Sequence, residues 1–367
     1  MENVDVTIIG AGAVGLAIAA KLSKEYQNIV ILESQGSYGQ GISSRNSEVV
    51  HTGIYYPTGS LKERLCVEGA HTLYSYCKKY SVPHKILGKL IVATSPEETK
   101  QLEMLFHNGI NNGVRGLSIL GHDDIVKIEP DVTATAAIYS SNTGIIDSHS
   151  LMKNLYDQAV SEGATFSFNS TVDLIEQEKD GYVIGIEEED FRLNSRIVIN
   201  SAGLYSDRIA ELAGMAVDDL GYRLEYRKGS YFSYQKCSPV KLLVYPLPDK
   251  GEKGLGIHAT LDLKERLRFG PDSELVKLID FSVDVNKKDT FYKAASQYIR
   301  GLDKDSFAPD MSGIRPSIKG EGIKDFIIKH ESGRDMVGFV NLVGIESPGL
   351  TASISIADYV SELLLDI

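Results

Sequence analysis

The chain has 367 residues, of which 43% are hydrophobic, and it carries a formal net charge of −12 with a pI near 5.2. A chain of this length can bury more core than one compact unit usually holds, so we expect two domains. The acidic balance and the lack of basic runs argue against a nucleic-acid partner and against electrostatic adhesion to anionic lipid.

The first residues, MENVDV, contain neither a basic n-region nor an apolar h-region, and no apolar run is long enough to span a bilayer. The three cysteines form no C-x-x-C pair and suit a reducing compartment. We therefore expect a cytoplasmic protein without a transmembrane segment. Peripheral contact at the inner face of the membrane stays open.

Residues 5–33 have the pattern of a dinucleotide-binding βαβ unit. The periodicity predicts a strand, a helix and a second strand over residues 6–9, 14–24 and 29–32. Three glycines, Gly10, Gly12 and Gly15, predict a tight turn between the first strand and the helix. Such a turn brings a pyrophosphate close to the backbone and to the helix N-terminus. Glu33 ends the second strand, where an acid binds ribose hydroxyls. The unit predicts a bound dinucleotide without identifying it.

Helix and strand patterns alternate along the rest of the chain. Helices are predicted over residues 61–80, from Ser95 onward, from Ser148 to Gly163, over 287–300 and over 350–365. Strands are predicted as a pair in residues 136–146, as several between 166 and 203 with a turn at 179–181, and throughout 222–269. We interpret residues 1–80, 147–215 and 312–367 as a nucleotide-binding domain, and residues 81–146 and 216–311 as an inserted, mostly antiparallel substrate domain.

Three further segments are ambiguous when each is taken alone. An apolar strand runs into Ala202 and Gly203, which also suits an ordinary strand-to-helix turn. Residues 41–69 place hydroxyl residues, an Arg, an Asn and a His after the second strand, which also suits a polar surface loop. In residues 340–353 a Pro and a Gly open a helix whose first N–H groups favour negative charge.

Taken together, the four segments resemble the FAD-dependent oxidases and dehydrogenases related to D-amino-acid oxidase, and among these the L-2-hydroxyglutarate dehydrogenase/oxidase group. The resemblance covers essentially the whole chain and is most specific in SSRNSEVVHTGIYYPTGSLK at 43–62. It extends to VYPLP at 244–248, GIH at 256–258, FGPD at 269–272, GIRP at 313–316 and GIESPGLTAS at 344–353. It implies an α/β fold with α+β elements, in which separated segments form a Rossmann-like FAD-binding domain of glutathione-reductase type.

The same resemblance implies FAD as the cofactor, bound non-covalently, and no metal. Gly10, Gly12 and Gly15 would hold the pyrophosphate, Glu33 the adenosine ribose and Val172 the adenine. The residues that would line the cofactor or lie towards the flavin are Ala202, Gly203, Ser43, Ser44, Asn46, Gly349, Leu350 and Thr351. Some relatives attach the flavin to a His near the position of His51, so covalent attachment is the alternative.

Oxidation of a 2-hydroxy acid needs an anchor for the carboxylate and a base for the hydroxyl proton. Arg315 is the best anchor, because a guanidinium binds a carboxylate through two parallel hydrogen bonds. His258 is the first choice of base and His51 the second. Tyr231, Tyr245 and Lys228 are further candidates for substrate binding.

This chain departs from the family pattern at two positions in the predicted substrate domain. Ser230 stands where Glu is usual, and Asp272 stands where Asn is common. The departures leave the cofactor prediction unchanged and bear on the substrate instead.

We expect oxidation of a small 2-hydroxy acid, such as L-2-hydroxyglutarate, to the 2-oxo acid by hydride transfer to N5 of FAD. The alternatives within the superfamily are a glycerol-3-phosphate or glycerol dehydrogenase and, less favoured, an amino-acid oxidase. A NAD-linked dehydrogenase and a non-catalytic FAD-binding scaffold are alternatives from other classes. The sequence leaves open the oligomeric state and the electron acceptor, which could be oxygen, a quinone or a carrier protein.

Overall fold

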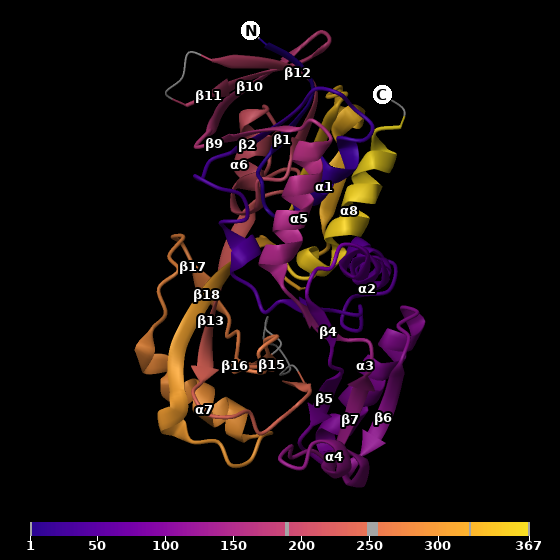
Figure 1. Ribbon diagram of the computed structural model, residues 1–367, viewed down its shortest axis with the longest axis vertical. Coiled ribbons are helices and arrows are strands. Elements are labelled where there is room, and N and C mark those ends of the chain that lie inside the picture. The colour runs from indigo at the N-terminus through magenta and orange to yellow at the C-terminus, as the bar shows by residue number, and fades with distance from the viewer. Residues whose placement is uncertain (1, 188–190, 248–255, 323, 366–367) are drawn as a thin grey trace.

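The computed structural model describes residues 2–187, 191–247, 256–322 and 324–365. Two large β-sheets organise this part of the chain (Figure 1). The eight-stranded sheet lies in the upper part of the view together with both termini, and the nine-stranded sheet lies in the lower part. The observed architecture is therefore the mixed α/β arrangement that the sequence predicts.

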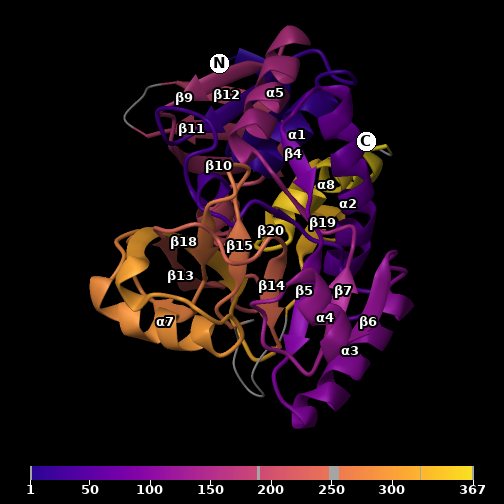
Figure 2. The same cartoon turned by 60° about the horizontal axis from the view of Figure 1, so that its bottom comes forward.

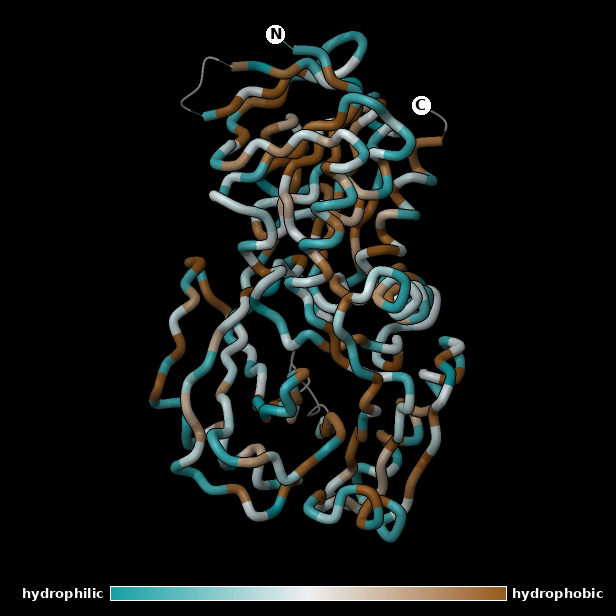
Figure 3. Tube along the Cα trace, viewed as in Figure 1, coloured by the Kyte–Doolittle hydropathy of each residue, from teal (hydrophilic) through white to brown (hydrophobic). Residues whose placement is uncertain are grey.

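The upper sheet is built around parallel strands. In spatial order these are β9 (Thr165–Phe168), β2 (Ile29–Glu33), β1 (Glu2–Ile9), β12 (Arg192–Asn200) and β20 (Phe339–Val343). Antiparallel pairing adds β10 (Val172–Glu178) and β11 (Gly181–Ile186) beside β12, and β19 (Ile327–His330) beside β20. The central strands are mostly apolar in their second halves, at residues 6–9 of β1 and 197–199 of β12, where both faces of the sheet are covered (Figure 3).

Helices cover one face of this sheet and form its main core. They are α1 (Ala13–Leu22), α2 (Leu61–Lys79), α5 (Ser148–Ser161) and α8 (Gly349–Leu363). Helices α2 and α8 pack closely, since a Cβ built on Gly69 would lie 2.7 Å from the carbonyl oxygen of Thr351. The short helix α6 (Ser206–Leu212) packs on the other face.

The lower sheet draws its strands from two separate stretches of the chain. The first stretch supplies β5 (Lys89–Ala93), β6 (Leu117–Gly121) and β7 (Ala136–Ser140). The second supplies β13 (Leu224–Tyr234), β14 (Leu243–Pro246), β15 (Ala259–Leu261), β16 (Leu267–Phe269), β17 (Glu274–Val276) and β18 (Phe307–Ile318). Helices α3 (Thr99–Asn111) and α4 (His122–Ile128) lie beside the first group of strands, and α7 (Lys288–Ser296) lies beside β18 (Figure 2).

A small third sheet joins segments that are far apart in sequence. It consists of β3 (Val49–Val50), β8 (Gly144–Ile146) and β4 (His84–Ile86). The strand pair predicted for residues 136–146 is therefore wrong as a pair. Strand β7 already has β5 and β6 on its two sides, so β8 pairs elsewhere.

Other predicted elements differ in detail. The segment after Ser95 begins with a 3₁₀ turn, and α3 starts only at Thr99. Helix α4 has no predicted counterpart, because its seven residues offer little helical periodicity. Helix α6 follows Gly203, as in the strand-to-helix turn that the sequence also allows there. The domain division stays a prediction, and its boundary at residue 312 falls inside β18. None of the helices in the described ranges combines the length and apolar character needed to cross a bilayer.

Candidate active site

The glycine-rich turn joins β1 to α1 with no room for side chains. Gly10 has a φ of +101°, a conformation that favours glycine. A Cβ on Gly15 would lie 2.0 Å from the carbonyl oxygen of Gly10, and a Cβ on Gly10 would lie 2.7 Å from that of Ser201. The start of α1 therefore lies directly on β1 and on the turn that contains Ala202 and Gly203.

Glu33 holds the other side of this turn. Its carboxylate accepts hydrogen bonds from the backbone N–H groups of Ala11 at 2.8 Å and Gln35 at 2.9 Å. The carbonyl oxygen of Glu33 accepts from the N–H of Ser170 at 2.9 Å, which brings Val172, the first residue of β10, to the same edge of the sheet. The residues assigned to the adenosine end of FAD are thus neighbours in space.

The loop of residues 41–51 connects the other parts of the site. Ser43 Oγ accepts from the N–H of Ala13 at 2.9 Å, at the N-terminus of α1. Further along, the loop packs on β18, because a Cβ on Gly313 would lie 2.3 Å from the carbonyl oxygen of Arg45. The loop ends where the His51 N–H donates to Thr351 Oγ1 at 3.0 Å, at the N-terminus of α8.

Ser44 and Asn46 shape this loop through hydrogen bonds within it. The Ser44 hydroxyl donates to the carbonyl oxygen of Gln40 at 2.7 Å, and Asn46 Nδ2 donates to that of Ser43 at 2.8 Å. The structure therefore gives both side chains a loop-forming role, in addition to the flavin-facing role that the sequence predicts for them.

The residues at the two helix N-termini fit an anionic dinucleotide. Neither α1 nor α8 has a side-chain cap from its own N-cap residue or an acidic residue in its first turn. Such ends stabilise negative charge, a pyrophosphate at α1 and the N1–C2=O edge of a reduced flavin at α8, where Gly349, Leu350 and Thr351 lie. The glycine turn allows the close approach that this binding requires.

Arg315 lies on β18 directly opposite Arg227 on β13. The Arg227 guanidinium is held by Glu225 through hydrogen bonds of 2.7 and 3.0 Å. Lys228 has Ile314 as its register partner, so it lies on the other face of the pair, where its Nζ contacts Asp280 at 2.8 Å. The structure thus separates Lys228 from Arg315, and we leave Lys228 out of the proposed site.

Acidic and phenolic groups surround Arg315. Glu346 lies near its guanidinium, but Glu346 also accepts from Lys62 Nζ at 2.7 Å and from Ser317 Oγ at 2.8 Å. Burial raises the pKa of Tyr231, and the charges of Arg315 and Arg268 oppose this shift. The charge of Arg315 thus acts on both groups, and its side chain stays partly accessible.

The two candidate bases differ in their surroundings. His51 keeps accessible surface, yet burial, Lys89 and Arg315 together lower its pKa to about 3. His258 is 5% exposed and stacks on the ring of Tyr245 with 3.6 Å between ring centroids. His51 keeps accessible surface and lies beside Thr351 at the N-terminus of α8, whereas His258 is buried, so His51 is the better placed of the two to contact a substrate.

Sequence reasoning missed Lys89 and Tyr55. Lys89 is 1% exposed, and its Nζ lies 5.2 Å from the ring centroid of Tyr55 and 4.9 Å from that of Tyr245. The Tyr55 hydroxyl is buried with no hydrogen-bond partner in the described part of the chain. The signal for Lys89 was present, since a lysine inside the apolar run LGKLIVA is unusual in a buried strand.

The two departures from the family pattern meet in one contact. The N–H of Ser230 donates to Asp272 Oδ1 at 2.6 Å, and Asp272 also pairs with Lys287 Nζ at 2.8 Å. The two residues thus form one local structural unit of the sheet. Pro248, part of the VYPLP motif, lies outside the described residues.

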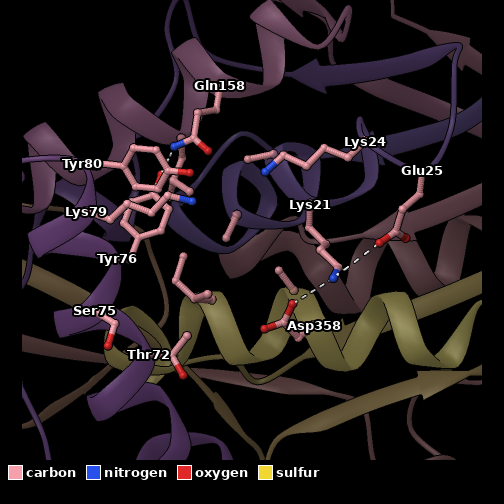
Figure 4. Close-up of a pocket in the computed structure, with 15 residues that line it drawn as sticks. Lys21, Lys24, Glu25, Thr72, Ser75, Tyr76, Lys79, Tyr80, Gln158 and Asp358 are labelled. Carbon is pink, nitrogen blue, oxygen red and sulfur yellow. Dashed lines mark hydrogen bonds and ion pairs between the residues drawn. The ribbon is translucent and has the colours of Figure 1, made fainter.

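A separate surface cavity of about 410 Å³ lies at the C-terminal half of α1 (Figure 4). Lys21, Tyr76 and Asp358 are among the residues that line it, and Lys21 pairs there with Asp358 at 3.2 Å. This position is away from the N-terminus of α1, so the cavity is distinct from the cofactor site. Within the described ranges, no cluster of His, Cys, Asp and Glu side chains is arranged to hold a metal ion.

Comparisons with known proteins agree with this geometry. The chain is 38% identical to the mitochondrial L-2-hydroxyglutarate dehydrogenase of Arabidopsis thaliana, over 99% of this chain and 84% of that protein. It is 30% identical to a glycerol 3-phosphate dehydrogenase of Caloramator mitchellensis, over 99% of this chain and 74% of that protein.

Among solved structures, the FAD-bound L-α-glycerophosphate oxidase of Mycoplasma pneumoniae aligns with a TM-score of 0.90 at 26% identity, covering 99% of this chain and 95% of that one. The family model for FAD dependent oxidoreductases matches residues 5–363. The cofactor is therefore FAD, and the chain belongs to the family of FAD-dependent oxidoreductases.

Proposed function

We propose that the protein oxidises a small 2-hydroxy acid of the L-2-hydroxyglutarate type to the corresponding 2-oxo acid. The observation that carries this proposal is the placement of a cationic Arg315 and a neutral His51 around the N-terminus of α8. An anion anchor and a base at the flavin end of the site are the groups that oxidation of a hydroxy acid requires. The 38% identity to a dehydrogenase named for this substrate supports the proposal.

The residues of the site divide the work between binding and proton transfer. Arg315 binds the carboxylate next to the hydroxyl-bearing carbon through its planar guanidinium. Tyr231, 5% exposed and near Arg315, borders the same position. His51 accepts the hydroxyl proton, and its low pKa in the free protein has to rise when the anionic substrate binds beside it.

When bound, FAD supplies the hydride acceptor at N5. Gly10, Gly12 and Gly15 would hold its pyrophosphate and Glu33 its ribose, while Thr351 marks the isoalloxazine end. We propose that binding is non-covalent and that His51 stays unmodified, since its ring is required as the base.

Glycerol 3-phosphate is the second candidate substrate. It is favoured by the similarity to the glycerol 3-phosphate dehydrogenase and by the fold match to the glycerophosphate oxidase. In that case, Arg315 would bind the phosphate instead of a carboxylate. An amino acid is less favoured, because the match to a glycine oxidase of Geobacillus kaustophilus is 20% identical and shows the fold alone.

Anaerobic bleaching of the bound flavin tests these alternatives. The purified protein is mixed with L- and D-2-hydroxyglutarate, glycerol 3-phosphate and glycine, and flavin absorbance is followed by stopped flow. We expect rapid bleaching with L-2-hydroxyglutarate and formation of 2-oxoglutarate. Bleaching by glycerol 3-phosphate alone would replace the proposed substrate with the second candidate.

A further inference from the structure

Lys89 is a buried cation inside the lower sheet. Its strand, β5, pairs with β7 on one side and β14 on the other, and all five residues of β5 are buried. Lys89 Nζ lies within 5.2 Å of two aromatic ring centroids, those of Tyr55 and Tyr245. These π faces offset part of the cost of burying the charge.

No carboxylate of the described residues forms an ion pair with Lys89. Lys62, the other buried lysine, shows the contrast, because its Nζ contacts Glu346 at 2.7 Å. A buried ammonium without an anionic partner is costly and is normally relieved by pairing. Next to it, the Tyr55 hydroxyl is also buried without a hydrogen-bond partner in the described ranges. The ring of Tyr55, whose hydroxyl is an unmatched donor, therefore borders a lysine that has no anionic partner in the described ranges.

These donors adjoin the site of the reaction. Lys89 and Arg315 both act electrostatically on His51. The charge of Arg315 also acts on Glu346, whereas no carboxylate of the described residues forms an ion pair with Lys89. Two cations therefore lie within electrostatic reach of the proposed base.

We propose that Lys89, together with the Tyr55 hydroxyl, binds the terminal carboxylate of a dicarboxylate substrate while Arg315 binds the carboxylate beside the reacting carbon. Lys89 would then set the preference for a dianionic 2-hydroxy acid over a monoanionic one. This inference rests on the proposed function and specifies which residue selects the substrate. A packing role alone would leave substrate preference unchanged.

A matched pair of substrates tests the proposal. L-2-hydroxyglutarate and L-2-hydroxypentanoate have the same five-carbon chain and differ in the terminal carboxylate. Rates of flavin reduction are measured with both acids for the unsubstituted holoenzyme and for Lys89→Met, which keeps most of the length of the side chain and removes its charge. Lys85→Met is the control, because Lys85 is an exposed lysine that pairs with Glu265.

We expect Lys89→Met to lower kcat/KM for L-2-hydroxyglutarate by about 10- to 100-fold, the usual scale for a lost charged hydrogen bond. Any effect of Lys89 on His51 is common to both acids, so the preference for L-2-hydroxyglutarate over L-2-hydroxypentanoate should fall by about the same factor, and Lys85→Met should change neither value. Lys89→Gln keeps a hydrogen-bond donor without the charge, so its kcat/KM for L-2-hydroxyglutarate should lie between those of the unsubstituted enzyme and Lys89→Met.

Other results would overturn the inference in distinguishable ways. An equal loss with both acids, or no loss with either, would show that Lys89 does not select the terminal carboxylate, while the proposed function would stand. Reduction by glycerol 3-phosphate alone, with neither acid active, would overturn both the proposed function and the dicarboxylate assignment.

Discussion

Replacing Arg315 by Ala is the most direct test of the carboxylate anchor. A charged hydrogen bond contributes about 1.5–3 kcal/mol, and a bidentate guanidinium makes two. Because every 1.4 kcal/mol is a factor of about ten, we expect kcat/KM for the hydroxy acid to fall by about 10²- to 10⁴-fold. Arg315→Lys should recover part of this loss, since it keeps the charge but not the fork of donors.

The structure predicts that the fold and the flavin survive this substitution. Glu346, the acid near Arg315, keeps its contacts with Lys62 Nζ at 2.7 Å and Ser317 Oγ at 2.8 Å. No buried charge is therefore left alone. The flavin spectrum and the melting temperature should stay close to those of the unsubstituted protein.

Stopped-flow flavin reduction over a range of substrate concentrations measures the effect. Lys228→Ala is the control, because Lys228 lies on the opposite face of the strand pair from Arg315 and contacts Asp280. It should change kcat/KM by less than about threefold, as for a partly exposed ion pair outside the site. If Arg315→Ala kept kcat/KM within about threefold while retaining its flavin, Arg315 would not be the anchor.

Four further predictions follow from the same geometry. His51→Gln should slow flavin reduction by about 10²- to 10⁴-fold, the scale of a general base, and His258→Gln should slow it less; the reverse order would return the role to His258. Gly15→Ala should cost about 1–3 kcal/mol of stability and reduce flavin content, because its Cβ would lie 2.0 Å from the carbonyl oxygen of Gly10. Gly333→Ala is the control, since its Cβ would meet open space; equal melting temperatures of the two variants would contradict this packing. Acid precipitation should release all flavin into the supernatant, and a yellow pellet would show covalent attachment. Burial lowers the pKa of Lys89 to about 8, and the titratable groups around it are Cys66, His51, Tyr55 and Tyr245. Because the charge of Lys89 is present below that pH and lost above it, kcat/KM for L-2-hydroxyglutarate should fall as pH rises through about 8, and kcat/KM for L-2-hydroxypentanoate should not.

The cofactor end of the molecule is predictable from local sequence. Gly10, Gly12, Gly15 and Glu33 act within one contiguous βαβ unit, and local spacing is sufficient to define such a unit. Short motifs likewise predict the helix start at Gly349 and the turn at Ala202. Because these motifs are local, FAD could be predicted from the sequence, and the family match confirms it.

The arrangement of the substrate side depends on how distant segments pack together. Register placed Lys228 on the opposite face from Arg315, and a one-residue offset along a strand is enough for that reversal. The contrast between His51 and His258 depends on burial and on neighbours 300 residues away in the chain, such as Thr351. The lack of an anionic partner for Lys89 likewise depends on how β5, β14 and the loop that carries Tyr55 pack together. No local sequence pattern specifies that packing.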